Sequence, residues 1–368
     1  MLIKNGVSRN GPRATPNLAI LRNRDLPLAQ RPERVLFFGK SMSRSRCTGG
    51  LVDALRRHGT TVRWVNMATL RRWMGREQAT RRALAIHARF APDLIFVFCC
   101  DLPVELLERF RVGTPVVQWV EEPRCTEMAD YMRRVDLVAL SNPNNAVALG
   151  EHGVRGTMYQ MSGFSPRYHF PIGPRVPRRD VAFIGGPGVH GERVEFLARI
   201  SEHVETQIFG PGWEPYRAKY PQLRIGGPVK AAGFRRICAS SRIVLGLNQC
   251  NDQPGYFSNR TFLTLACRAF HLTHYVPGLE NVFEDGVHLA WYHDADECVA
   301  RVGEFLGDHK RRESIASAGH KLVVDRHQYF HRVERILHVL THGLAEDAAL
   351  AFVDRHRTPV AARMPASD

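Results

Sequence analysis

The chain has 368 residues, which at about 150 residues per domain predicts two domains. Hydrophobic residues make up 44% of the chain and charged residues 24%, which excludes wholesale disorder. The 51 Lys and Arg residues exceed the 36 Asp and Glu residues and give a formal net charge of +15. Such a balance favours an anionic partner, namely a nucleic acid, a phosphorylated substrate or a membrane surface. No apolar run approaches the roughly 20 residues that a membrane-spanning helix needs.

In the first part of the chain, apolar runs of strand length alternate with amphipathic helical runs. Strands are expected at 35–38, 62–65, 94–98, 116–120, 137–140 and 157–161, and helices at 50–58, 68–90 and 104–110. The runs at 94–98 and 116–120 are apolar throughout, as in parallel strands that are covered on both faces. This alternation predicts a doubly wound sheet with right-handed crossovers.

A loop rich in proline and glycine, at 162–179, precedes a second series of the same kind. Strands are expected there at 181–184, 206–209, 243–247 and 270–273, and helices at 189–200, 230–239, 260–267 and, three times, between 294 and 340. We therefore predict an α/β protein with two Rossmann-like domains, 34–170 and 171–342, which face each other across a cleft. A flexible basic arm at 1–33 and a tail at 343–368 flank them. Ligands of such sheets bind outside the carboxyl ends of the strands, so the cleft is the expected site.

Each domain has a glycine-rich turn after its first strand. The glycines and nearby cations are Gly49 and Gly50 with Lys40, Arg44 and Arg46 in the first domain, and Gly186 and Gly188 with Arg193 in the second. Free N–H groups at a helix N-terminus favour an anion, and an arginine can hold a phosphate with two hydrogen bonds. Neither turn is a P-loop, because no Gly-Lys-Ser/Thr closes the required spacing. The alternative is a pair of tight turns without a ligand.

Two further segments of the second domain are candidates for ligand contact. Gly210 and Gly212 follow the strand at 206–209 and would let the backbone approach a planar base beside Trp213, unless the segment is a packed surface loop. Lys230 stands at the start of an expected helix, where it either contacts a phosphate or is a solvated charge.

Carboxylates at strand ends of the first domain are the candidate catalytic bases. Asp101 follows the strand at 94–98, and Glu121 and Glu122 follow the strand at 116–120. Burial in a cleft can raise the pKa of one member of such a pair and suit it to proton transfer. The alternatives are a helix cap for Asp101 and a solvated loop position for one glutamate.

Several other chemistries are not expected. The 17 histidines include no His-Glu-x-x-His and form no closed set with cysteines, so no metal site is predicted. No Gly-x-Ser-x-Gly elbow for serine catalysis occurs. The eight cysteines contain no C-x-x-C, and the N-terminus lacks the apolar segment of a signal peptide, which together predict a reduced, cytoplasmic protein.

The segment 258–286 reads SNRTFLTLACRAFHLTHYVPGLENVFEDG. It resembles the C-terminal domain of CgeB-like GT-B glycosyltransferases, which are related to the group 1 (GT4-like) transferases, and the likeness extends over about residues 34–342. The resemblance implies a nucleotide-diphosphate-sugar donor on the second domain, near Ser258, Asn259 and Arg260, and an acceptor on the first. The acceptor is a small molecule, a glycan or a lipid-linked compound, and neither a metal nor another cofactor is implied.

The chain departs from this family's pattern at three positions. Leu263 stands where the family usually has the Glu expected to hold the donor ribose, and Gly255 stands where GT4-like enzymes carry another Glu. Arg268 replaces a Gly and either fills space or reaches a phosphate. Two functions therefore stay open: an active glycosyltransferase, and a catalytically weakened GT-B protein that binds a nucleotide or sugar without transfer.

The basic excess leaves one further partner to consider. Arginines cluster with apolar residues and Trp73 in the helical run at 68–90, at positions 71, 72, 76, 81, 82 and 89. This run could lie on an anionic membrane surface, or its apolar stripe could pack on its own sheet. No nucleic-acid partner is expected, because the chain lacks a recognition motif and a stacking platform of aromatic residues.

Overall fold

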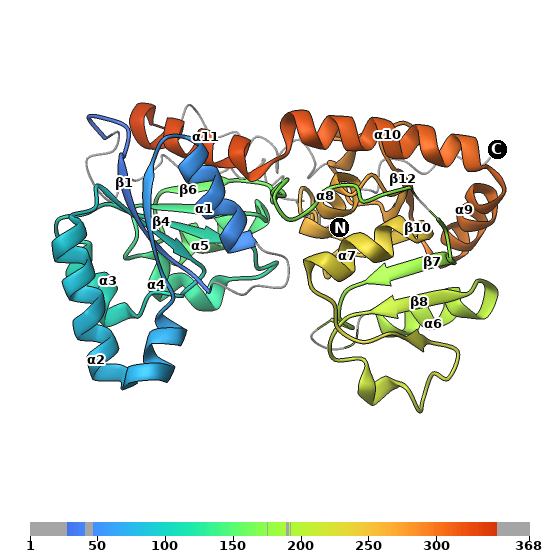
Figure 1. Ribbon diagram of the computed structural model, residues 1–368, viewed down its shortest axis with the longest axis horizontal. Coiled ribbons are helices and arrows are strands. Elements are labelled where there is room, and N and C mark those ends of the chain that lie inside the picture. Colours follow the sequence, from blue (N-terminus) through green and yellow to red (C-terminus); the bar gives the residue numbers. More distant parts are fainter. Residues whose placement is uncertain (1–27, 41–46, 175, 189–190, 192, 344–368) are drawn as a thin grey trace, which may run out of the picture.

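The computed structural model describes residues 28–40, 47–174, 176–188, 191 and 193–343. Within them the chain forms two six-stranded sheets with packed cores on both faces (Figure 1). The predicted α/β class with two Rossmann-like domains is therefore confirmed. Most of the predicted basic arm and of the tail lies outside the described residues.

The first domain holds a purely parallel sheet with strand order β2-β1-β3-β4-β5-β6. Its elements are β1 (Arg34–Phe38), α1 (Cys47–Arg57), β2 (Thr61–Val65), α2 (Met67–Phe90), β3 (Leu94–Phe98), α3 (Val104–Phe110), β4 (Val116–Val120), α4 (Ala129–Met132), β5 (Leu137–Leu140), α5 (Asn144–Glu151) and β6 (Thr157–Tyr159). The strands β3, β4 and β5 have the predicted bounds, because runs that are apolar throughout identify buried parallel strands. The sequence analysis missed α4 and α5, which are only 4 and 8 residues long.

The second domain holds a parallel sheet with strand order β12-β11-β10-β7-β8-β9. Its elements are β7 (Arg179–Ile184), α6 (Val194–His203), β8 (Thr206–Phe209), β9 (Arg224–Ile225), α7 (Ala231–Ala239), β10 (Ser241–Gly246), α8 (Asn259–Ala266), β11 (His271–His274), β12 (Ala290–Tyr292), α9 (Ala295–Gly307), α10 (His309–Arg326) and α11 (Tyr329–His342). The unpredicted edge strands β9 and β12 have only 2 and 3 residues, too few to show a pattern.

Each sheet has one point at which the chain order reverses. In the first sheet β1 lies between β2 and β3, and in the second β7 lies between β8 and β10. The connections that leave these strands run to opposite sides, which opens a crevice at their carboxyl ends. The crevices lie after β1 and β3 in one domain and after β7 and β10 in the other.

The final helix, α11, packs on the first domain and not on the second. Its buried side chains, among them Tyr329, Val333 and Ile336, share a core with Leu51 and Val52 of α1. Figure 1 shows α11 over the half of the molecule built by β1–β6, and α10 over the other half. The prediction that all terminal helices belong to 171–342 is therefore wrong for α11, whose apolar face packs on the apolar face of α1.

Two segments of the chain cross between the domains and are bonded to each other. The backbone N–H of Tyr329 donates to the carbonyl of Phe164 at 2.8 Å, and Phe164 pairs with Gln328 as an isolated β-bridge. Arg332 on α11 donates to the carbonyl of Ser162 at 3.1 Å. Elsewhere, the hydroxyl of Tyr159 at the end of β6 donates to the carbonyl of Gly255 in the second domain at 2.6 Å.

The basic helix α2 packs its apolar stripe on its own sheet, which was one of the two predicted alternatives. It bends at Gly75, whose φ is +76°. Leu70 and Met74 before the bend, and Leu84 and Ile86 after it, lie against the core of the first domain. Trp73 remains 75% exposed.

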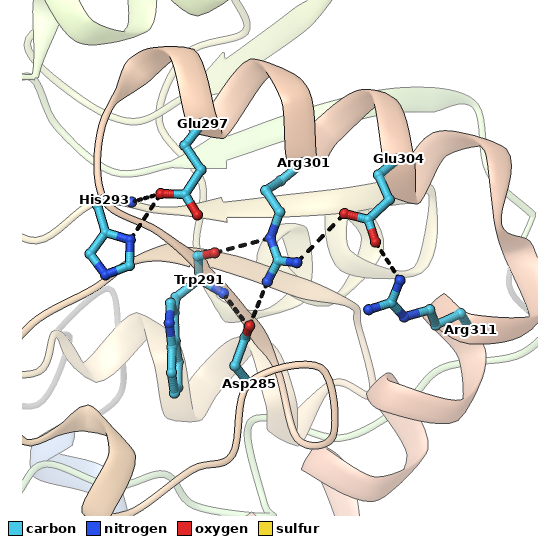
Figure 2. Close-up of polar contacts among 7 residues, drawn as sticks. All are labelled: Asp285, Trp291, His293, Glu297, Arg301, Glu304 and Arg311. Atoms are coloured by element: carbon cyan, nitrogen blue, oxygen red, sulfur yellow. Dashed lines mark hydrogen bonds and ion pairs between the residues drawn. The ribbon is translucent and has the colours of Figure 1, made fainter.

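At the far end of the second domain, an ion-pair network ties α9 to its surroundings (Figure 2). Arg301 donates to both carboxylate oxygens of Asp285, at 2.8 and 2.6 Å, and lies 3.5 Å from a carboxylate oxygen of Glu304. Glu304 also pairs with Arg311 of α10. Each cation here has a carboxylate partner, so the network joins α9, α10 and the loop before β12.

Candidate donor site between the two domains

Arg260 lies at the reversal point of the second sheet. From the first turn of α8, its guanidinium donates to the carbonyls of Ile184, which ends β7, and Leu247, which follows β10, both at 3.1 Å. Ser258 caps the helix, and its hydroxyl accepts from the Arg260 side chain at 3.0 Å. Arg260 therefore bridges the two strand ends between which a ligand of this fold binds.

A second arginine stands close to Arg260. Arg193 is 7% exposed and donates to the carbonyls of Gly186 at 3.0 Å and Asn248 at 3.4 Å. Both guanidinium groups lie over the ring of Phe183, at 6.0 Å for Arg193 and 5.3 Å for Arg260. Desolvation and repulsion from Arg193 lower the pKa of Arg260 to about 9.

The described residues place no carboxylate in an ion pair with Arg260, whose acceptors are two carbonyls and a hydroxyl. A buried cation with only neutral acceptors and a cationic neighbour is stabilised by any anion that binds beside it. The arrangement therefore suits a phosphate or a diphosphate.

A pocket of about 130 Å³ adjoins Arg260. Its lining residues are His169, Ile184, Gly185, Phe209, Gly210, Pro211, Val229, Lys230, Phe234, Asn259, Arg260 and Leu263. The structure thus brings together Gly210, Lys230, Asn259 and Arg260, four of the predicted donor-contacting residues. Lys230 is exposed at the N-terminus of α7, and its side chain does not cap that helix.

Two glycines are required here because of how closely the chain approaches itself. A Cβ atom on Gly185 would lie 1.8 Å from the guanidinium of Arg260, and one on Gly210 would lie 2.0 Å from the carbonyl oxygen of Gly185. Glycine at these positions lets Arg260 and the two loops meet. Gly186 contributes a carbonyl to Arg193, and Gly188 and Gly212 adopt positive φ angles of +98° and +83°.

Trp213 does not contact the pocket. Its side chain is 1% exposed, packs edge-on against Phe183 and donates to the carbonyl of Gly185 at 2.7 Å. The interpretation of Trp213 as a residue beside a bound base is therefore wrong, because a buried indole offers no free face. Its role is to hold the Gly185 loop.

The first domain presents its carboxylates at its own reversal point. The carboxylate of Asp101 accepts from the backbone N–H of Lys40 at 2.9 Å and lies 3.6 Å from the Lys40 ammonium. It does not cap α3, whose N-cap is Pro103, so the capping alternative is wrong. Lys40 ends the described part of the turn, and Arg44 and Arg46 lie outside the described residues.

Glu121 and Glu122 have contrasting surroundings. Glu121 accepts from the Ser162 hydroxyl at 2.7 Å, the Cys47 thiol at 3.2 Å and the Tyr329 hydroxyl at 3.4 Å. The exposed Glu122 has no such donors, and partial desolvation together with the charges of Glu121 and Glu127 raises its pKa. The pair therefore divides into a carboxylate held by three donors, Glu121, and one whose pKa is raised, Glu122.

Gly49 and Gly50 lie inside α1 and are buried. A Cβ atom on Gly49 would lie 2.9 Å from the hydroxyl of Tyr168, and one on Gly50 would lie 2.5 Å from the ring of Tyr329. Glycine is thus needed for packing against the interdomain segment and α11. That these two glycines also border a ligand stays a prediction.

Three residues of the site were missed by the sequence analysis. Tyr256 is 7% exposed and lies among Arg260, Arg193 and Glu121, all of which influence its pKa, which burial raises to about 12. Asn248 orders the α8 N-terminus by accepting from the Ser258 backbone N–H at 2.9 Å. The third, His169, lines the pocket from the interdomain segment. Loop residues distant in sequence carry no periodic signal, so only the fold reveals their convergence.

Two of the departures from the family's pattern have clear places in the structure. Leu263 is 2% exposed and forms part of the pocket wall. Arg268 has a φ of +54°, donates to the Ser317 hydroxyl at 3.1 Å and does not line the pocket. Of its two predicted roles, contact with a phosphate of the donor is therefore not observed.

In the described part of the chain, no three His, Cys, Asp or Glu side chains are grouped so that they could hold a metal ion. None of the described helices combines the length and the apolar composition needed to cross a membrane.

The chain was compared with known families and structures. Residues 192–338 match a family model described as "Glycosyl transferase-like". No curated protein gives a significant sequence match.

Several solved structures share the fold. HepE from Anabaena, in complex with UDP-glucose, is 13% identical and aligns over 84% of this chain and 99% of its own, with a TM-score of 0.60. Sucrose-phosphate synthase from Thermosynechococcus elongatus is 11% identical over 83% of this chain and 97% of its own, with a TM-score of 0.61. A glycosyltransferase from Rickettsia africae is 8% identical over 85% of this chain and 99% of its own, with a TM-score of 0.58.

The chain therefore has the two-domain GT-B fold of these glycosyltransferases. Within this fold, residues 192–338 are similar to the glycosyl transferase-like family. The finer assignment to the CgeB-like subgroup stays a prediction.

Proposed function

We propose that the protein transfers a sugar from a nucleotide-diphosphate-sugar to an acceptor hydroxyl. The observation that carries the proposal is the arginine pair, Arg193 and Arg260, at the reversal point of the second sheet. Negative charge grows on the leaving diphosphate as its bond to the sugar breaks. Cations fixed in advance therefore stabilise the transition state more than the bound donor. In this proposal Arg193, Arg260 and Lys230 neutralise the charge without a metal ion or another cofactor.

The first domain supplies the acceptor side in the same proposal. Glu122, whose pKa is raised, is the best suited of the three carboxylates to accept the hydroxyl proton. Glu121 is held by Ser162 and Tyr329 and orients the acceptor, and Asp101 keeps Lys40 at the crevice. The domains face each other at Tyr256, because the charges of Glu121 in the first domain and Arg260 in the second both influence the pKa of its hydroxyl.

The choice of donor is supported by the structural neighbours. HepE has been solved with UDP, with UDP-glucose, and with UDP and glucose. These ligands belong to HepE, and they make uridine nucleotides the first donors to test on this chain.

One observation favours a second candidate, a weakened protein that binds the donor without transfer. Leu263 occupies the pocket wall, and no lining residue of the pocket carries a carboxylate for sugar hydroxyls. Transfer of sugar, or slow hydrolysis of the donor, distinguishes the two candidates.

The test combines calorimetry and an activity assay. Wild-type protein is titrated with UDP, dTDP, GDP and ADP, and the matching glucose conjugates are assayed for transfer or hydrolysis. Arg260→Met is expected to weaken nucleotide binding by about 10- to 100-fold, because a hydrogen-bonded charge contact contributes roughly 1.5–3 kcal/mol. Arg268→Met, just beyond the C-terminal end of α8, is the matched control. Failure of all four nucleotides to bind the wild type would overturn the proposal.

The acceptor and the place of action are further parts of the proposal. The cysteines are free, which supports a reducing, cytoplasmic setting. Trp73, exposed among Arg71, Arg72 and Arg76 on α2, supports peripheral contact with an anionic membrane and thus a lipid-linked acceptor, in preference to a free glycan or small molecule. Co-sedimentation with vesicles rich in phosphatidylserine checks this, since Trp73→Ser should reduce binding. Equal binding by both proteins would dismiss the membrane contact.

A further inference from the structure

His169 is a buried histidine whose ring forms no hydrogen bond with the described part of the chain. It lies in the segment that joins β6 to β7, and its side chain is 1% exposed. Neither ring nitrogen has a hydrogen-bond partner within the described residues. Its neighbours from α7 are the ring of Phe234, edge-on at 5.7 Å, and Arg235. Buried polar groups in folded proteins almost always have a hydrogen-bond partner. An unpaired buried imidazole in a pocket wall is therefore a candidate for hydrogen bonding to a ligand.

The position of His169 is fixed by its neighbours in the chain. Arg235 donates to the backbone carbonyl of Tyr168 at 2.5 Å and lies over the ring of Phe170 at 4.3 Å. The side chain of Tyr168 in turn contacts Gly49 of the first domain. The histidine is thus held between α7 and α1 and cannot leave the pocket wall without breaking these contacts.

The imidazole is neutral at physiological pH. Desolvation, with a further effect of the Arg235 charge, lowers the pKa of His169 to about 4. A neutral imidazole offers one N–H donor and one nitrogen acceptor. The two nitrogens point away from each other, so the imidazole forms one hydrogen bond with an acceptor or a donor at the edge of a ligand, and it supplies no positive charge for an anion.

The pocket that His169 lines combines polar groups with apolar walls. Arg260, Lys230 and Asn259 supply its hydrogen-bond donors, whereas Phe209, Val229, Phe234 and Leu263 form apolar walls. The volume of about 130 Å³ is close to the roughly 150 Å³ of a protein cavity known to accept benzene. A single six-membered ring fits this space, and a fused bicyclic ring would extend beyond it.

We propose that His169 recognises the nucleobase of the donor and that this base is a pyrimidine. The diphosphate lies beside Arg260, and the ring lies against the apolar walls, where one acceptor or donor group of its edge forms a hydrogen bond with the imidazole. The inference rests on the proposed function, since it needs a nucleotide donor on the second domain. It adds the class of base and the residue that selects it.

The experiment measures affinities of the full chain by calorimetry for UDP, GDP, ADP and inorganic pyrophosphate. Wild-type protein should bind UDP at least about tenfold more tightly than GDP or ADP. In His169→Phe, which keeps a ring but loses both nitrogens, UDP affinity should fall by about tenfold while pyrophosphate affinity stays unchanged. His203→Phe, at an exposed histidine of α6, is the matched control and should behave as wild type.

A second variant covers the case that His169→Phe does not fold. His169→Ala enlarges the pocket, so the preference for UDP over GDP should collapse. Wild-type protein that binds GDP or ADP as tightly as UDP, or a folded His169 variant that keeps both the UDP affinity and the UDP preference, would overturn the inference alone. Wild-type protein that binds neither pyrophosphate nor any nucleotide would overturn the proposed function with it.

Discussion

Two groups of arginines in the second domain have opposite surroundings. Arg301 faces Asp285 and Glu304, and Arg311 faces Glu304, so the charges of that network are balanced within the protein. Arg260 is bonded to carbonyls and a hydroxyl, with Arg193 as a second cation nearby. Balanced charges join α9 to α10, whereas Arg260 has no carboxylate partner among the residues that the structure describes. The kind of hydrogen-bond partner, carboxylate or neutral acceptor, therefore distinguishes a structural cluster of arginines from a candidate binding site.

Lowering the pH has the largest expected effect, a loss of folding stability. It protonates buried histidines that lie next to buried arginines. Desolvation and the nearby Arg260 lower the pKa of His271 to about 4, and desolvation and Arg332 lower that of His327 to about 3. Both values lie below the 6.5 of an exposed histidine. The folded state thus binds fewer protons than the unfolded chain below pH 6.5, and stability present above that pH is lost as the pH falls toward the folded values.

The loss at pH 5 should be on the order of 2 kcal/mol for each of the two histidines. Urea unfolding at pH 7, 6 and 5 measures it. His327→Gln should flatten the pH dependence, and the exposed control His203→Gln should leave it unchanged. An unfolding free energy that stays constant down to pH 5 would contradict the prediction.

Gly185→Ala should have the second largest effect, a loss of nucleotide affinity. The substitution acts at Arg260 and not at the network of Arg301 and Arg311. The added methyl group would lie 1.8 Å from the Arg260 guanidinium and would displace it from the ends of β7 and β10. We expect nucleotide affinity to fall by about 100-fold, since several charge-assisted contacts are lost together. Calorimetry with UDP checks this, and a variant that binds UDP normally would show that Arg260 is not part of the site.

Arg301→Met tests the balanced group. The partly buried Asp285 and Glu304 lose their shared partner, so the unfolding free energy should fall by about 1–3 kcal/mol while UDP affinity stays unchanged. Lys321→Met removes an exposed ion pair with Asp325 and is the control, with an expected change below about 0.5 kcal/mol. A loss of UDP affinity in Arg301→Met would remove the distinction between the two groups.

Gly303→Ala has the smallest expected effect and is the counterpart of Gly185→Ala. Gly303 lies within α9, and a Cβ atom there would meet nothing within 4 Å. Alanine should stabilise the helix by about 0.5–1 kcal/mol and leave binding unchanged. Thermal unfolding measures the gain. A destabilised variant would mean that α9 tolerates less change than its open surroundings indicate.

The architecture was largely predictable because parallel strands covered on both faces leave a strong sequence signal. β3 and β4 were predicted with their bounds, and the short β9 and β12 were missed because two or three residues show no pattern. The position of α11 was not predictable either. Its amphipathic pattern shows that one face is buried, but not that the buried face lies on the first domain.

The position of a residue was predictable from the sequence where that residue ends a strand or begins a helix. It was not predictable where tertiary packing determines which side chains surround the residue. Arg260 and Lys230 stand at helix N-termini, and both line the pocket. Gly49, Gly50 and Trp213 have the composition of a ligand loop, yet their environments are Tyr168, Tyr329 and Phe183. Tyr256 and His169 come from segments without periodicity, so only the folded chain brings them to the site.

The packing of α11 on the first domain also has a consequence for synthesis on the ribosome. Domains generally fold in the order in which they emerge, but the first domain here cannot be finished in that order. The face of α1 that carries Leu51 and Val52 stays uncovered until Val333, Ile336 and their neighbours have been made. The second domain is then almost fully synthesised, so the domain that emerges first is completed last, and its apolar face is open to chaperones in the meantime.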